Sequence, residues 1–289
     1  MTKPGAAAIR RILVALDASP HSLAALRAAV DLAAKMDAEL EGLFVEDAAL
    51  LRLAELPCAR EVLHFSTAEF PLTRASMESR LKAQSEQIRR ALEAAATRAR
   101  IEWSFRIARG EVAAEVLAAA AGVDLLALGR GGWALDRRVR TGSTALEIAA
   151  SSLPVLLLPE RGIPENAHLL VYYDSSPAAQ RALLAAAQIA EAGMDGLTLL
   201  VKSGIGIDKE PIEREVAALL EGMALEVRYL HFDPDKKDSL LVALKAEKNG
   251  VLVLGSRKPL QELLPLSAFL SETEMPLLIL GDELPPQTE

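Results

Sequence analysis

Several residue types are scarce in this sequence, and each scarcity excludes a class of protein. Among 289 residues there is one cysteine, Cys58, so no intrachain disulfide can form and a reducing cytoplasm is the expected location. We expect Cys58 to be a small, buried apolar residue. Two tryptophans, three tyrosines and six phenylalanines are too few for an aromatic platform that stacks single-stranded nucleic acid.

Long apolar runs and an excess of positive charge are also missing. No stretch reaches the roughly 18 apolar residues of a membrane span, and the first apolar run, 12–16, has the length of a strand rather than of a secretory signal. The net charge of −8 argues against a general binder of nucleic acid or anionic membranes. With 51% hydrophobic and 25% charged residues, the composition is that of a globular protein long enough for two domains.

Familiar catalytic and cofactor motifs are absent as well. The sequence contains no Gly-Lys-Ser/Thr of a phosphate loop, no GxSxG, no HExxH and no CxxC. Its four histidines are scattered without the spacing of metal ligands. No nucleophile and base converge in the pattern, so we expect neither catalytic residues nor a metal site built by protein side chains.

What the sequence does contain is an internal repeat. Residues 10–34, RRILVALDASPHSLAALRAAVDLAA, and residues 168–192, HLLVYYDSSPAAQRALLAAAQIAEA, each combine an apolar strand, an aspartate, a Ser-Pro pair and an alanine-rich helix. Ser19 and Ser176 are placed to cap these helices, with proline in the first turn. Later Val/Leu/Ile runs alternate with helical segments, which is typical of buried parallel strands.

We therefore predict an α/β fold of two tandem, doubly wound, Rossmann-like parallel-sheet domains that arose by duplication. The first domain spans 1–162 and the second spans 163–289. The first carries an insertion at about 47–100, in which the apolar spacing predicts a helix over 76–100. Two roles are open for this insertion: extra packing of the core, or a lid or partner-binding surface.

One stretch, GRGGWALDRRVRTGST at 129–144, follows an apolar strand and precedes a helix expected to begin at Ser143. Bare glycine backbone and the amide groups of a helix N-terminus favour phosphate, and the hydroxyls of Ser143 and Thr144 suit phosphate or a bridging Mg²⁺. A solvated surface loop is the alternative for the arginines at 137–140. For Asp17, the alternative is a turn residue that bonds its own backbone.

The spacing of Gly129, Gly132, Gly142 and Ser143, G-x2-G-x9-G-[S/T], resembles the signature of ATP-binding universal stress proteins. The resemblance covers 9–160 and, more weakly, 168–280. It implies an adenine nucleotide alpha hydrolase-like fold that binds ATP, ADP or AMP, either with or without a Mg²⁺ ion bound to the phosphates. Carried over by position, the implied nucleotide contacts are Ala15, Leu16, Asp17, Val45, Gly129, Arg130, Gly132, Gly142, Ser143 and Thr144, none of them catalytic.

The second half departs from this signature. Lys258 stands at the second glycine position, and the Leu-Ser-Ala at 266–268 lacks the glycine of the third. We therefore expect one nucleotide per chain. The resemblance implies that the second half serves as a built-in partner that pairs final strands, or that two chains form a homodimer.

The resemblance implies a cytoplasmic stress-response regulator with at most very slow ATP hydrolysis and an unidentified protein partner. Two other functions stay open. One is a nucleotide-independent adaptor or chaperone-like protein, which the apolar segment at 49–65 would suit. The other is an ATP-using transferase, which would need acid and base residues around a substrate pocket.

Overall fold

The computed structural model of the chain describes residues 9–62, 69–131, 143–191, 193, 196–202, 210–236, 238–263 and 265–281. Its first half alternates strands with helices along the chain. These elements are β1 (Arg11–Leu16), α1 (Pro20–Met36), β2 (Glu39–Asp47), α2 (Ala48–Leu53), β3 (Arg60–Val62), β4 (Glu69–Pro71), α3 (Arg74–Ala99), β5 (Trp103–Gly110), α4 (Val112–Ala120), β6 (Leu125–Gly129), α5 (Ser143–Ala149) and β7 (Val155–Leu158).

The second half repeats the alternation without the segment between β2 and α3. Its elements are β8 (His168–Tyr173), α6 (Pro177–Glu191), β9 (Leu197–Lys202), α7 (Glu210–Leu219), β10 (Val227–Phe232), α8 (Ser239–Ala246), β11 (Gly250–Leu254), α9 (Lys258–Glu262), α10 (Leu266–Glu272) and β12 (Leu277–Ile279). The predicted duplication of an α/β fold is thereby confirmed.

The main sheet of the described residues has ten strands in the order β10-β9-β8-β11-β12-β7-β6-β1-β2-β5. Within each half the strands are parallel, and the chain starts in the middle, moves outward, and then returns to build the other side. This is the doubly wound order expected from the sequence. In the first half the direction of winding reverses between β1 and β6, and in the second half between β8 and β11.

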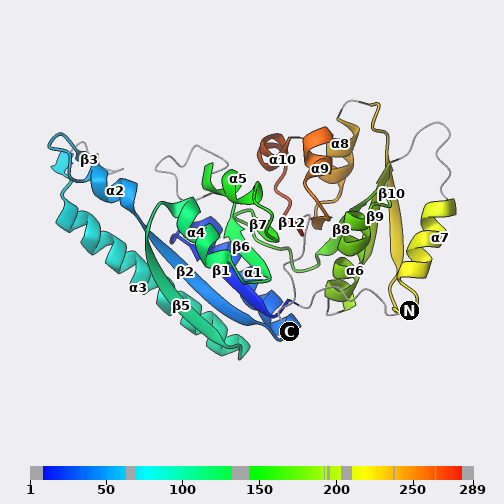
Figure 1. Cartoon of the computed structure of the whole chain (residues 1–289), viewed down its shortest axis with the longest axis horizontal. Coiled ribbons are helices and arrows are strands. Elements are labelled where there is room, and N and C mark those ends of the chain that lie inside the picture. The colour runs from blue at the N-terminus through cyan, green and yellow to red at the C-terminus, as the bar shows by residue number, and fades with distance from the viewer. Residues whose placement is uncertain are drawn as a thin grey trace.

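The two halves join through their final strands, as expected for intrachain pairing. β7 and β12 run antiparallel, with Leu157 opposite Leu277, and both side chains are fully buried. Figure 1 shows the result as one continuous sheet, with α1, α3, α6 and α7 on one face and α4, α5, α8, α9 and α10 on the other. Each of the two apolar layers contains residues of both halves, so the core continues across the junction.

The insertion is more structured than the sequence indicated. The expected long helix is α3, which begins with a capping box between Thr73 and Ser76 and buries Leu81, Ile88 and Leu92 against the core. Neither α2 nor the short β3–β4 hairpin at the outer end of β2 was predicted from the sequence (Figure 1). Core packing is therefore one role of this insertion.

Cys58 follows α2 in a turn of the insertion and is exposed, so the expectation of a buried apolar residue was wrong. The preceding residues of this turn, 55–57, are exposed as well. In the described ranges, no helix combines the length and apolarity that a bilayer-spanning segment requires.

Candidate functional site

Three of the predicted site segments meet at one edge of the sheet. β1 lies between β2 and β6, with Leu16 opposite Phe44 and Ala15 opposite Leu128. The chain leaves these strands at Asp17, Asp47 and Gly129, so the predicted contacts at Leu16, Val45 and Gly129 come from neighbouring carboxyl ends. This edge is also where the winding of the first half reverses, the place at which open α/β sheets bind ligands.

Asp17 forms the turn between β1 and α1. Its carboxylate accepts a hydrogen bond from the Ser19 amide at 2.9 Å, and Ala18 takes a left-handed conformation with φ 62°. Ser19 then caps α1 by accepting the Ser22 amide at 3.1 Å. The local-turn role that the sequence left open for Asp17 is therefore real, whether or not the carboxylate also meets a ligand.

The same turn occurs in the second half, which supports this interpretation. Asp174 accepts the Ser176 amide at 3.1 Å, Ser175 has φ 61°, and Ser176 caps α6 through the Ala179 amide at 3.2 Å. Because the half with the degenerate glycine pattern keeps the aspartate, its presence is explained by the turn and does not by itself mark a nucleotide site.

Gly129 and Gly131 let the first turn of α1 approach the end of β6. A Cβ at Gly129 would lie 2.7 Å from the backbone carbonyl carbon of His21, and one at Gly131 would lie 2.9 Å from Cε1 of its imidazole. Gly255 stands in the same relation to Ala178 of the second half, where a Cβ would overlap the carbonyl. Helix packing therefore requires a glycine after this strand in both halves, independently of any phosphate.

His21 is a further residue at this end of the strands, and no sequence motif identified it. Its imidazole lies against the bare backbone of Gly131, within the glycine stretch. The second half has Ala178 at the corresponding position after the helix-opening proline. That difference between the two repeats was the signal that could have identified it.

Arg130 is directed toward the second half. The residue is 3% exposed, and its Nη2 donates to the carbonyl of Thr273 at 2.8 Å and lies 3.5 Å from the Glu274 carboxylate. Burial lowers the pKa of Arg130 to about 10, with Glu274 opposing the shift and Arg161 adding to it, so the guanidinium stays charged at neutral pH.

This geometry favours an interface role for Arg130 over the expected phosphate contact. Among the described residues, its Nη1 is buried without a hydrogen-bond partner. A contact from that nitrogen to a phosphate stays a prediction.

The other end of the glycine stretch is α5, which begins at Ser143 as expected. Thr144 is half-buried in its first turn, and Ala145 and Ile148 anchor the helix in the core. The predicted contacts Gly132 and Gly142, and the arginines at 137–140, lie outside the described residues.

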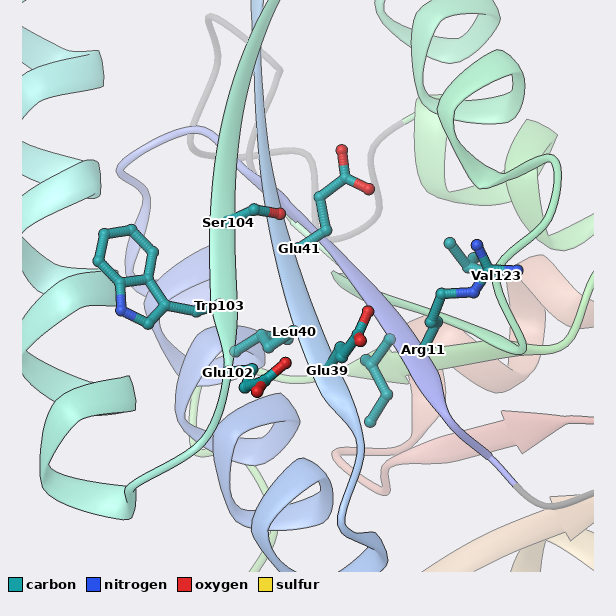
Figure 2. Close-up of a pocket in the computed structure, with 9 residues that line it drawn as sticks. Arg11, Glu39, Leu40, Glu41, Glu102, Trp103, Ser104 and Val123 are labelled. Carbon is teal, nitrogen blue, oxygen red and sulfur yellow. The ribbon is translucent and has the colours of Figure 1, made fainter.

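A cavity of about 230 Å³ opens at the opposite edge of the sheet. Figure 2 shows its lining, which comes mainly from the amino ends of β1, β2 and β5, with Arg11, Glu39 and Glu102 among the residues. One of its carboxylates, Glu41, is paired with Arg106 at 2.9 Å. This cavity lies at the far end of the strands from Gly129, and the described residues hold no group of three acidic, histidine or cysteine side chains suited to a metal.

Comparison with known proteins adds a family and a fold. The model of the universal stress protein family matches residues 8–159. A universal stress protein from Archaeoglobus fulgidus is 18% identical, with a TM-score of 0.66 over 93% of this chain and 97% of that one. A protein of unknown function from Pseudomonas aeruginosa is 14% identical, with a TM-score of 0.50 over 94% and 92%. At these identities both structures support the fold alone, and no curated protein sequence matches.

Proposed function

The chain belongs to the universal stress protein family, whose model covers more than half of its length, and from this premise we propose that its first half binds one adenine nucleotide. The nucleotide is ATP or AMP, and it lies at the carboxyl ends of β1, β2 and β6. Occupancy of this site, rather than efficient turnover, is the output that makes the chain a stress-response regulator.

The observation that carries the proposal is the meeting of Leu16, Val45 and Gly129 at the point where the winding reverses. The glycine backbone at Gly131 and the hydroxyl of Thr144 supply donors suited to the oxygens of ribose and phosphate, while the Arg130 amide is already used by the Leu158 carbonyl at 2.8 Å. The side chains of Asp17 and Ser19 form hydrogen bonds within the turn, which supports binding rather than catalysis.

The second half supports a single site by contrast. After Gly255 the chain turns directly into α9, which begins at Lys258, where the first half has its glycine stretch. Pro259 in the first turn of α9 has no amide hydrogen, and side chains longer than glycine line this connection, so fewer accessible amide groups are left for a phosphate. In the first half a nucleotide therefore approaches glycine backbone, whereas in the second half it meets the helix α9.

Titration with ATP tests the proposal in a matched pair of variants. Ser143→Ala with Thr144→Ala removes both hydroxyls of α5, while Ser267→Ala removes the exposed hydroxyl at the corresponding position of α10. We expect the first variant to lose most of its ATP affinity and the second to bind as the unchanged protein does. Equal ATP affinity of the unchanged protein and both variants would show that the nucleotide does not contact these hydroxyls and lies elsewhere. If the unchanged protein binds no ATP, the proposed function is refuted.

A nucleotide-independent adaptor is the second candidate, because the insertion and the neighbouring edge expose apolar side chains. Leu56 is 50% exposed in the insertion, and Ile107 is 51% exposed on β5, the edge strand of the sheet. The absence of ATP binding at millimolar concentration, together with loss of partner binding in Leu56→Ser, would favour this function over the first.

A further inference from the structure

Two arginines cross the junction between the halves in opposite directions. Arg130, directly after β6, donates to the carbonyl of Thr273, the residue that follows α10. Arg257, shortly after β11, donates through Nε to the carbonyl of Ala149, the last residue of α5, and lies 3.4 Å through Nη2 from the carbonyl of Leu153. Each half therefore sends the arginine that follows its glycine strand to the carboxyl end of the other half's last helix.

These contacts satisfy backbone carbonyl groups at the carboxyl ends of α5 and α10. The last carbonyl groups of a helix have no partner within it and carry partial negative charge, which a guanidinium satisfies. Ala149 is fully buried and Thr273 is 7% exposed, so water is a poor substitute for the arginine at either carbonyl. Figure 1 places α5 and α10 on the same face of the sheet, beside the paired β7 and β12.

The consequence concerns the glycine stretch of the first half. The stretch has two described ends: Arg130, which follows β6, and the helix α5. Arg130 is bonded to Thr273 of the second half, and α5 is bonded at its last residue to Arg257 of the second half.

We propose that Arg130 and Arg257 form a reciprocal lock that positions the end of β6 and the helix α5, which carry the predicted nucleotide contacts Gly129 and Thr144, so that the ATP affinity of the first half depends on an arginine of the second. This inference rests on the proposed nucleotide site and deepens it. Arg257 is a positioning residue, because its described hydrogen bonds go to the carbonyls of Ala149 at the end of α5 and of Leu153. By linkage, bound ATP in turn strengthens the hold of the second half on α5.

Arg257→Ala tests the lock, with ATP affinity measured by calorimetry at a temperature where each variant is fully folded. We expect affinity to fall about 5-fold or more, the usual range of coupling between sites. Arg257→Lys, which keeps the charge but loses the planar fork, should recover part of it. Lys35→Ala is the control, because Lys35 also crosses the junction, donating to the Gly193 carbonyl at 3.0 Å, but from the far end of α1. Its ATP affinity should not change.

Hydrogen exchange of the α5 amide groups without nucleotide gives a second measurement. Arg257→Ala should speed their exchange, while Lys35→Ala should leave it unchanged. If the unchanged protein binds ATP and Arg257→Ala binds it within about twofold with unchanged α5 exchange, the lock is overturned while the nucleotide site stands. If the unchanged protein binds no ATP, both proposals fall together.

Discussion

Gly281 offers a sharp test of how closely the two halves fit. It follows β12 with φ +81°, and a Cβ at this position would overlap the carbonyl oxygen of Ser152 in the first half and lie 3.2 Å from its carbonyl carbon. Gly281→Ala therefore incurs two costs. The left-handed backbone costs about 1–2 kcal/mol for a residue with a Cβ, and relief of the overlap by shifting packed backbone costs about 1–3 kcal/mol more.

Gly222→Ala is the matched control for the backbone cost alone. Gly222 has φ +88° in the turn after α7, and among the described residues other than its chain neighbours nothing lies within 4 Å of a Cβ there. Equilibrium unfolding in urea should show a loss of about 1–2 kcal/mol for the control. The loss for Gly281→Ala should be larger by the cost of the overlap. Equal losses for the two variants would show that the junction is looser than described and would refute the reasoning.

Three further predictions concern other parts of the molecule. Leu92→Ala, in the fully buried face of α3, should lower the free energy of unfolding by about 2–5 kcal/mol in urea, whereas a loss under about 1 kcal/mol would mean that the insertion is not part of the core. Gly255→Ala should lower the melting temperature in a thermal scan, because a Cβ would overlap the Ala178 carbonyl, and an unchanged value would contradict the close approach of α6. Although burial raises the pKa of Glu215, hydrogen bonds from Ser175, Gln180 and Tyr173 outweigh it and lower the pKa below 4.5. Its stabilising contribution is therefore present above that pH and is lost as pH falls, so Glu215→Gln should flatten the acid side of the stability profile, and an unchanged slope would contradict this.

Local chemistry explains which parts of the fold were predictable. The Ser-Pro pairs fixed the starts of α1 and α6, the apolar runs identified the buried strands, and helical spacing located α3. The match between the two repeats predicted the duplicated fold, whereas the pairing of β7 with β12 was implied only by the family resemblance. Each of these features depends on residues within a few positions of one another, or on comparison of two such segments.

The missed features depend on contacts between distant parts of the chain. Arg130 looked like a phosphate ligand because it stands in a glycine stretch, and nothing near it indicated that its guanidinium reaches Thr273, 143 positions away. The same limitation hid the role of His21, whose side chain meets Gly131 only after α1 folds back onto β6. The strands β3 and β4 have three residues each, too short for an alternating pattern to be recognised.

The number of nucleotides bound per chain is the most direct test of the proposed division of labour between the halves. Purified full-length protein, freed of bound nucleotide, would be titrated with ATP by calorimetry, and nucleotide released on denaturation would be identified by mass spectrometry. We predict one adenine nucleotide per chain, lost in Ser143→Ala with Thr144→Ala. Two equivalents per chain, or none, would contradict a first half that binds the nucleotide and a second half that holds the first in place.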